Sequence, residues 1–216
     1  MDDTFDFLCE QVPELAPCLP KLERAFDLLS RAFREGGKLL VCGNGGSAAD
    51  SEHIVGELMK GFDRRRALSR TEREHLHALY AREGRYLAEH LQGALPAISL
   101  TSQTSLITAV ANDTAAEMVF AQQVYGYGRP GDVLLAISTS GNSRNVLHAL
   151  RVARAAGVAT VGLTGPGGGE MAALCDVALC VPPGATRPGD TAEIQRAHQA
   201  LYHALCRKLE EEFFSR

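Results

Sequence analysis

The sequence predicts an α/β fold in which helices cover both faces of a parallel β-sheet. Short apolar runs alternate with helical stretches along the chain, which is the order of elements in parallel-sheet proteins. The runs are apolar at consecutive positions, as in strands that are buried on both faces. The chain has 216 residues, of which 45% are hydrophobic, so it can bury the core of one large domain or two small ones.

Helical elements precede the first strand. Pro13 and Pro17 interrupt a short helical piece near the start of the chain. Residues 19–35 then place apolar side chains at helical spacing, and the glycine pair at 36–37 ends this helix in the usual C-terminal way. Residues 1–36 are therefore expected to form N-terminal helices.

Five apolar runs are the predicted strands, and helical stretches lie between them. The strands are expected at residues 38–43, 95–100, 132–138, 159–165 and 176–182. The later helices are expected at residues 104–110, 115–125, 143–156, 168–174 and 191–214. Ligands of such folds bind at the carboxyl ends of the strands, so the residues that directly follow each strand are the candidate site residues.

One charged segment, residues 63–92, has no strand character and is predicted to be a helical insertion. Ser69 and Glu72 form the sequence pattern of a capping box, which starts a helix. The segment carries a partial apolar stripe, with Gly84 as the expected break. A helical hairpin that packs partly on the body of the protein or on another subunit is the predicted structure.

Charge and composition exclude several classes of function. The formal net charge is −4, so nucleic acid is a poor candidate for the ligand. No apolar run approaches the ~20 residues of a membrane span, and the acidic start, MDDTFDFLCE, is unlike a signal peptide. Six scattered cysteines without CxxC spacing fit buried thiols in a reducing compartment, so a cytoplasmic location without membrane contact is expected.

Two strand-to-helix junctions are rich in glycine and small hydroxyl residues. The first, GNGGSAAD, spans residues 43–50, and the second, STSGNS, spans residues 138–143. Backbone N–H groups at the start of a helix favour an anion, and serine and threonine hydroxyls add hydrogen-bond donors. Either loop alone is well explained as a simple turn, but two of this composition predict a phosphate site.

A dinucleotide is the alternative ligand for the first loop. Gly43, Gly45 and Ala48 match the pattern G-x-G-x-x-A, which is weak by itself. A Rossmann site also needs an acidic residue at the end of the next strand, and AISLTSQTS contains none. The chain lacks GxxxxGK[ST], which excludes a P-loop, and the second loop has no lysine. A sugar phosphate therefore fits these loops better than a triphosphate with magnesium.

Four polar residues on two predicted helices are candidates for catalysis or metal binding. His53 and Glu57 are four positions apart, so they share one face of the helix after the first loop. Gln195 and His203 lie on the last helix, about 12 Å apart along its axis. These groups suit a zinc ion, but a surface His–Glu pair is the more frequent explanation of the first spacing. The spacing therefore leaves the four-ligand set open.

The segments CGNGGSAADSEHIVGEL, AND, GDVLLAISTSGNSRNVLHAL and DTAEIQRAHQALYHAL together resemble the sedoheptulose 7-phosphate isomerases, or phosphoheptose isomerases, of the sugar isomerase (SIS) domain class. The resemblance covers nearly the whole chain apart from residues 63–92. It implies a single SIS domain over residues 1–216, with a five-stranded parallel sheet in a three-layer sandwich of the flavodoxin or Rossmann kind. It also implies a homotetramer with active sites at subunit interfaces, and the apolar surface of the first and last helices favours such an assembly.

The implied reaction is an aldose–ketose isomerisation. Sedoheptulose 7-phosphate becomes D-glycero-D-manno-heptose 7-phosphate, the entry to the heptoses of lipopolysaccharide core or of other glycans. By match of motifs, Glu57 is the implied general base and His203 the general acid, and the proton passes through an enediol. The implied ligands of one zinc ion per subunit are His53, Glu57, Gln195 and His203. The implied substrate-binding residues are Asn44, Gly45, Gly46, Ser47, Asp113, Ser138, Thr139, Ser140, Ser143 and Gln195.

The sequence departs from the family pattern at three places. Compact members lack the insertion, which follows the position of a family arginine, and Lys60 or Arg64 is the expected substitute here. Arg196 replaces the usual glutamate after the motif glutamine. Two alternatives stay open: a non-catalytic SIS protein that senses phosphosugars or assists replication initiation, and an isomerase of another phosphosugar. The first is disfavoured because such proteins generally lack the four positions that this chain retains.

Overall fold

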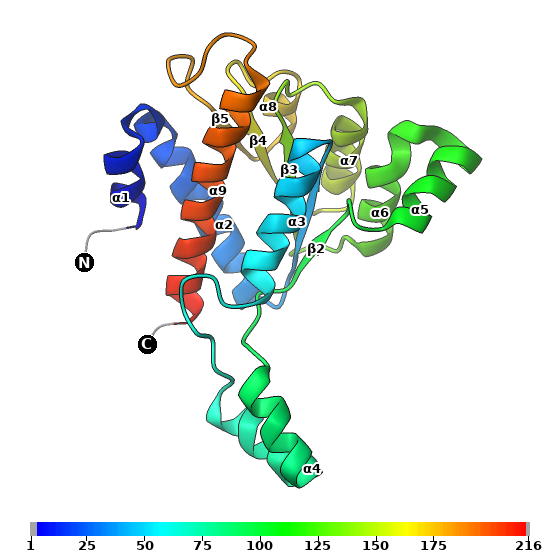
Figure 1. The fold of residues 1–216 in the computed structure, drawn as a ribbon. Helices are drawn as coiled ribbons and strands as arrows, with labels where there is room; N and C mark the ends of the chain where they lie inside the picture. Colours follow the sequence, from blue (N-terminus) through cyan, green and yellow to red (C-terminus); the bar gives the residue numbers. More distant parts are fainter. Residues whose placement is uncertain (1–3, 215–216) are drawn as a thin grey trace.

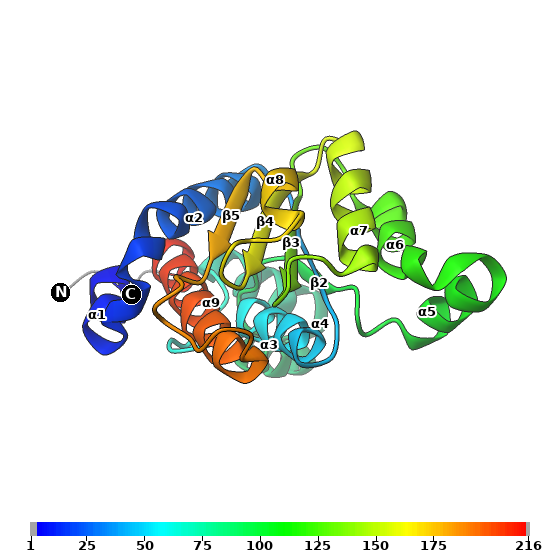
Figure 2. The same ribbon diagram turned by 90° about the horizontal axis from the view of Figure 1, so that it is seen from above.

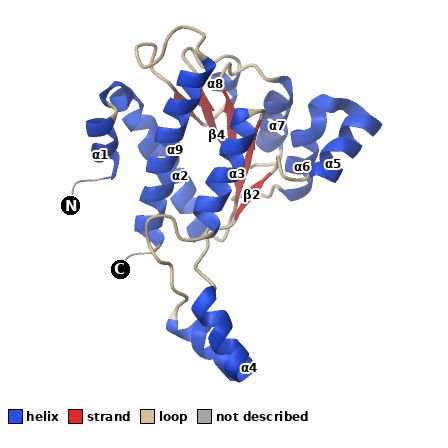
Figure 3. Ribbon diagram, in the orientation of Figure 1, coloured by secondary structure: helices blue, strands red, loops and turns tan. Residues whose placement is uncertain are grey.

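The computed structural model describes residues 4–214 and consists of one parallel sheet with helices on both faces (Figures 1 and 3). The described chain forms a five-stranded sheet in the order β2-β1-β3-β4-β5, and all neighbouring strands pair in parallel. The strands are β1 (Leu39–Gly43), β2 (Ala97–Ser99), β3 (Val133–Ser138), β4 (Ala159–Thr164) and β5 (Val177–Cys180). The predicted fold class is confirmed.

The helices alternate with the strands, and some are shorter than expected. They are α1 (Thr4–Gln11), the 3₁₀ helix η1 (Pro13–Cys18), α2 (Leu19–Arg34), α3 (Gly46–Met59), α4 (Arg70–His90), α5 (Thr104–Val110), the π-helical turn η2 (Ala111–Ala115), the 3₁₀ turn η3 (Ala116–Met118), α6 (Val119–Tyr127), α7 (Arg144–Ala155), α8 (Met171–Leu174) and α9 (Thr191–Phe213). The helix predicted from residue 115 begins at Val119 because η2 and η3 come first. The helix predicted from residue 168 shrinks to α8 because Gly167, Gly168 and Gly169 have positive φ angles. Among the described residues, no helix is long and apolar enough to cross a membrane.

The strands bury both faces in two separate cores. In β1, Leu39 and Val41 pack into a core with α1, α2, α3 and α9. Leu40 and Cys42, the alternate side chains of the same strand, pack into a second core with α5, α6, α7 and α8. Figure 2 shows the two groups of helices on either side of the sheet. This layering explains why the strand sequences are apolar at consecutive positions.

The strand order places β1 and β3 side by side at a topological switch point. From β1 the chain moves outward to β2, and it then returns across β1 to form β3. Leu39 of β1 pairs with Ala97 of β2 on one side and with Val133 of β3 on the other. Ligands of open α/β sheets bind where the direction reverses. The loops that follow β1 and β3 are the two hydroxyl-rich loops that the sequence singled out.

The insertion is a helical hairpin, α4, that projects from the body of the molecule (Figure 1). Ser69 and Glu72 form both hydrogen bonds of the predicted capping box. The break is at Ala81, which has a φ of 48°, and not at Gly84 as expected. Gly84 has a different role: a Cβ there would lie 2.0 Å from the carbonyl oxygen of Leu76, so glycine lets the two arms of the hairpin approach each other.

Candidate active site

The loops after β1 and β3 line one pocket of about 300 Å³. Asn44 and Asn145 exchange two amide hydrogen bonds of 2.9 Å, which tie the first loop to α7. The residues that line the pocket are Asn44, Gly45, Gly46, Ser47, Ile137, Ser138, Thr139, Ser143, Thr191 and Gln195. The structure therefore places most of the proposed substrate-binding residues around a single space.

Glycines shape the first loop. Gly45 has a φ of 55°, a conformation that other residues rarely adopt. A Cβ at Gly46 would lie 2.1 Å from the Gln195 amide nitrogen, so glycine lets this side chain of α9 rest against the loop. Gly46 is also the first residue of α3, and with Ser47 it borders the pocket. The positive end of the dipole of this helix therefore faces a space that an anion can occupy.

The second loop presents hydroxyl groups to the same space. The hydroxyl oxygens of Ser138 and Ser143 are 3.0 Å apart, and both residues line the pocket. Ser143 precedes α7 without capping it through its side chain, so when one of these two O–H groups donates to the other oxygen, the second remains a donor for a ligand. Ser140 differs, because it does not line the pocket. Its hydroxyl accepts a hydrogen bond from the backbone N–H of Asn142 at 3.2 Å and lies 3.5 Å from the hydroxyl of Ser138.

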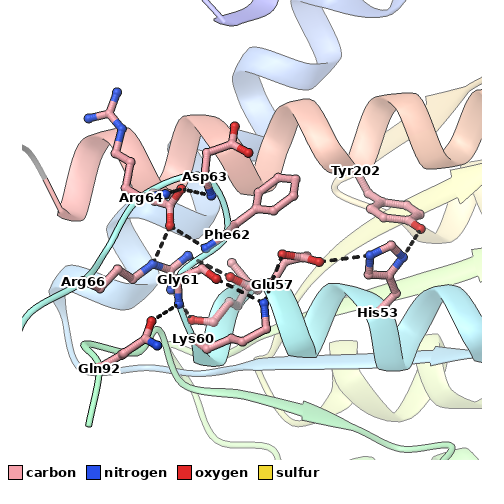
Figure 4. A network of polar contacts seen from close by, with 12 residues as sticks. His53, Glu57, Lys60, Gly61, Phe62, Asp63, Arg64, Arg66, Gln92 and Tyr202 are labelled. Atoms are coloured by element: carbon pink, nitrogen blue, oxygen red, sulfur yellow. Dashed lines mark hydrogen bonds and ion pairs between the residues drawn. The ribbon is translucent and has the colours of Figure 1, made fainter. Parts of the chain in front are cut away.

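A cluster of titratable side chains lies between α3 and α9 (Figure 4). His53 Nε2 and Glu57 Oε1 are 3.0 Å apart, so this pair of the predicted helix face is in contact. The other nitrogen of His53, Nδ1, lies 3.0 Å from the hydroxyl of Tyr202 in α9. The rings of His53 and His203 meet edge to face, with centroids 4.9 Å apart. His53, Glu57 and His203 therefore form one group although they come from two helices.

Burial sets the protonation states in this cluster. Burial, assisted by His53, lowers the pKa of His203, so its ring is neutral at neutral pH. Burial raises the pKa of Tyr202, whose phenol stays protonated and donates to Asp50 at 3.2 Å. Glu57 Oε2 and His203 Nε2 are buried without a hydrogen-bond partner among the described residues. A substrate oxygen or a metal ion would satisfy both atoms.

Gln195 lies apart from the other three proposed zinc ligands. Its amide packs against Gly46 in the pocket, about 12 Å along α9 from His203. Within residues 4–214, no group of three or more histidine, cysteine, aspartate or glutamate side chains is placed to hold a metal ion. Both ring nitrogens of His53 already have partners, so it must release Glu57 or Tyr202 to coordinate a metal.

Asp113 lies outside both the pocket and the cluster. Its carboxylate accepts a hydrogen bond of 2.8 Å from the side chain of Asn112, in the turn that follows α5. Figures 1 and 2 place α5 at the edge of the molecule, away from α3 and α9. Within one subunit, the structure does not bring Asp113 to the other proposed substrate-binding residues.

Lys60 and Arg64, the two substitutes for the family arginine, differ in position. Lys60 Nζ lies 3.8 Å from Glu57 Oε2, so Lys60 places a cation beside the cluster. Arg64 instead pairs with Glu211 at 3.3 Å. Sequence reasoning passed over Arg66, which is buried and contacts the backbone of α3. It stands in a run of arginines in which nothing in the sequence distinguishes one from another.

Sequence reasoning also missed Tyr202, which contacts the ring of His53, and Asp50, which accepts a hydrogen bond from Tyr202. Asp50 precedes His53 by three positions on α3, and Tyr202 directly precedes His203 on α9. Helical spacing was the signal that could have found Asp50. Together these contacts fix the orientation of the imidazole.

The strand order and the two hydroxyl-rich loops at the switch point define an α/β protein of the SIS class. Two overlapping segments of the chain, residues 10–89 and 76–165, match the family model described as SIS domain. The two matches overlap at residues 76–89, within the α4 hairpin.

Similar proteins define the family more narrowly. The chain is 40% identical over 215 residues to the phosphoheptose isomerase of Rhodospirillum rubrum, covering 98% of each chain. It is 41% identical over 195 residues to that of Roseiflexus sp., covering 90% of this chain and 83% of the relative. The solved phosphoheptose isomerase of Neisseria gonorrhoeae has a TM-score of 0.73 and 34% identity, covering 96% of this chain and 95% of its own. That of Francisella tularensis has a TM-score of 0.74 and 29% identity, with coverage of 96% and 94%. The chain belongs to the phosphoheptose isomerase family.

Proposed function

We propose that this protein isomerises sedoheptulose 7-phosphate to D-glycero-D-manno-heptose 7-phosphate. The observation that carries the proposal is the placement of two sites along α3, with the hydroxyl-lined pocket at its first turn and the His53–Glu57 pair beyond it. His53 follows Gly46 by about 10 Å along the helix axis. The side chain of Glu57 reaches back to His53, since helical side chains lean toward the N-terminus. A sugar whose phosphate occupies the pocket extends along α3 toward this pair.

Glu57 and His203 have the properties that the reaction needs. Isomerisation moves a proton between neighbouring carbons through an enediol, while an oxygen accepts a proton. The carboxylate of Glu57, in a residue only 8% exposed, is the proposed base that carries the proton between the carbons. The lowered pKa of His203 makes its ring a neutral N–H donor, the proposed acid that polarises the carbonyl and protonates its oxygen.

The substrate-binding assignments follow the pocket. The proposed phosphate ligands are Ser47, Ser138, Thr139, Ser140 and Ser143, with the backbone of Gly45 and Gly46 beside them. Asn44 and Gln195 are proposed to contact the sugar, because both are amide side chains that line the pocket. Ser140 has the weakest support, since it does not line the pocket. Its hydroxyl accepts a hydrogen bond from the backbone of its own loop, and this leaves its O–H as a donor.

Zinc is the proposed metal of the His53, Glu57 and His203 cluster, with one ion per subunit. The donor types suit zinc, and Glu57 Oε2 and His203 Nε2 are buried without a hydrogen-bond partner among the described residues, although Lys60 Nζ lies 3.8 Å from Glu57 Oε2. The fit is only partial, because Gln195 lies in the phosphate pocket and no three ligating groups converge within the described residues. A bound zinc ion would orient and polarise the substrate oxygens. The proton transfers are assigned to Glu57 and His203 alone.

A homotetramer is the proposed assembly. The apolar surface that supports it is not on the first and last helices, where the sequence analysis expected it. The apolar side chains of α9 are buried within the subunit, and α1 exposes one large apolar residue, Phe7. Large apolar side chains are exposed instead on the hairpin and near α5 and α6: Leu79, Tyr80, Tyr86, Leu87 and Leu91, and Leu106, Met118, Tyr125 and Tyr127. Two separate patches suit a tetramer with two kinds of twofold interface. Asp113, in the turn that follows α5, would lie at an interface formed by α5 and α6.

The domain and the compartment are proposed on simpler grounds. One SIS domain is proposed for residues 1–216, because the helices before β1 pack into the same core as α3 and α9. A cytoplasmic location is proposed because all six cysteines are free thiols.

The product is proposed to enter the synthesis of heptose-bearing glycans such as lipopolysaccharide core.

The test is to incubate the purified protein with sedoheptulose 7-phosphate and to follow the aldose product by NMR. Turnover that is lost in Glu57→Gln supports the proposal. Pentose and hexose phosphates are assayed beside the heptose, and faster turnover of either assigns the enzyme to another phosphosugar. Binding of phosphosugars without turnover of any of them favours the non-catalytic alternative.

A further inference from the structure

Arg66 is a buried arginine, 1% exposed, in the segment between α3 and the hairpin. Its Nη1 and Nη2 atoms donate to the carbonyl oxygens of Leu58 and Glu57 at 2.6 and 2.7 Å, and its Nε donates to Glu210 at 2.8 Å. Figure 4 shows Arg66 beside the end of α3, close to the turn at Gly61. The three contacts use the planar fork of the guanidinium, which a lysine cannot reproduce.

The two carbonyls that Arg66 holds belong to the last turn of α3. The last four carbonyls of a helix have no partner within the helix, and α3 ends at Met59. Arg66 satisfies two of these four groups and places its positive charge at the negative end of the helix dipole. The residue that carries the proposed catalytic base is therefore fixed through its own backbone.

Glu210 of α9 holds the turn that follows α3. Besides Arg66, its carboxylate accepts hydrogen bonds from the backbone N–H groups of Phe62 and Asp63 at 2.8 Å and of Arg64 at 3.1 Å. Glu210 is fully buried and stands seven residues after His203, which is about two helical turns along the same face. The Arg66–Glu210 pair therefore connects the end of α3 to the helix that carries His203.

We propose that Arg66 and Glu210 are positioning residues that set the placement of the Glu57 carboxylate relative to His203. The proposal rests on the proposed function, in which Glu57 is the base. Neither residue lines the phosphate pocket, so both act through the backbone of α3. A displacement of a reacting group by about 1 Å can reduce turnover by about 10²-fold. Loss of the pair is thus expected to lower kcat while the phosphate loops continue to bind substrate.

Two variants and one control test this role. Arg66→Lys keeps the charge but loses the forked contacts. The double variant Arg66→Met with Glu210→Met removes both charges together, which avoids leaving one of them buried without a partner. The matched control is Arg70→Met with Glu74→Met, an ion pair of 2.6 Å that is exposed on the hairpin.

The measurements are kcat and KM for sedoheptulose 7-phosphate, beside circular dichroism and melting. We expect kcat to fall about 10- to 100-fold in both Arg66 variants, with KM little changed and the control like the wild type. A folded variant with the wild-type kcat overturns the proposal. A fall in kcat that is fully explained by a smaller fraction of folded protein also overturns it. If the double variant does not fold, Arg66→Lys decides by the same criteria.

A second background separates positioning from a purely structural effect. If Arg66 acts through Glu57, adding Arg66→Lys to Glu57→Gln causes no further loss of kcat. If the losses of kcat caused by the two substitutions multiply instead, the two residues act independently and the proposal is overturned. Absence of turnover in the wild type, or normal turnover in Glu57→Gln, overturns the proposed function itself. Normal turnover in the Arg66 variants alone overturns only the positioning role.

Discussion

Acidification from pH 7 to pH 5 is expected to destabilise the folded protein through His198, a fully buried residue of α9. Burial lowers the pKa of its imidazole to about 4, and a backbone interaction with Thr164 offsets only part of this effect. The ring is therefore neutral in the folded protein at pH 5. In the unfolded chain it titrates near 6.5, so it is largely charged at the same pH.

The magnitude follows from the two pKa values. Between pH 6.5 and pH 4 the unfolded chain binds a proton that the folded protein does not bind, so the free energy of unfolding falls as the pH falls. Each pH unit in this range is worth about 1.4 kcal/mol, which gives about 3 kcal/mol in total and about 2 kcal/mol by pH 5. Against a typical stability of about 5–15 kcal/mol, this loss is large enough to measure.

The assay compares wild type with His198→Leu by urea unfolding at one fixed protein concentration, at pH 7, 6 and 5. We expect the variant to lose about 2 kcal/mol less stability than the wild type between pH 7 and pH 5, whatever its stability at pH 7. His75→Leu, at an exposed histidine of the hairpin, is the matched control. Parallel pH profiles for wild type and His198→Leu would refute the reasoning.

Three further outcomes are expected. Glu57→Gln should lower kcat by about 10²–10⁴-fold, and the metal content of the variant is measured in the same preparation. The control is Glu52→Gln, which should keep the wild-type kcat because the Glu52 carboxylate accepts from hydroxyls outside the cluster. Ser143→Ala should raise KM by about 10- to 100-fold with a smaller change in kcat, because one hydrogen bond to a charged phosphate is lost; an unchanged KM would remove Ser143 from the phosphate site. Leu79→Glu with Tyr86→Glu should give a smaller assembly by light scattering, and an unchanged mass would show that the hairpin is not a subunit contact.

The sheet and the two loops could be predicted because their signals are local. A strand buried on both faces must be apolar at consecutive positions, so β1 and β3 are visible in the sequence alone. The capping box at Ser69 is equally local. The turn of the hairpin is not, because Ala81 adopts a positive φ that alanine rarely takes, and sequence rules assign such turns to glycine.

The residues that hold the site in place make contacts that no local sequence pattern specifies. Arg66 is one of three consecutive arginines, and Glu210 is one of three consecutive glutamates. Which arginine is buried against which glutamate depends on how the segment after α3 crosses α9, and only the packed fold determines this. The position of the Gln195 side chain could not be predicted from the sequence either. Its spacing to His203 does not show that the side chain points toward Gly46.

The two ends of the hairpin segment meet at the body of the protein. Ala67 and Gln92 pair across an antiparallel bridge, and the backbone N–H of Gly61 donates to the Gln92 side chain at 2.7 Å. Because the chain leaves and returns at the same point, the segment between these residues can change in length without altering the spacing of α3 and β2. Closing a longer loop adds little entropy cost, about 0.6 kcal/mol for each doubling of its length. A foreign peptide or a reporter domain can therefore be inserted at this junction in place of α4. The insertion would replace about 20 residues and leave the sheet intact.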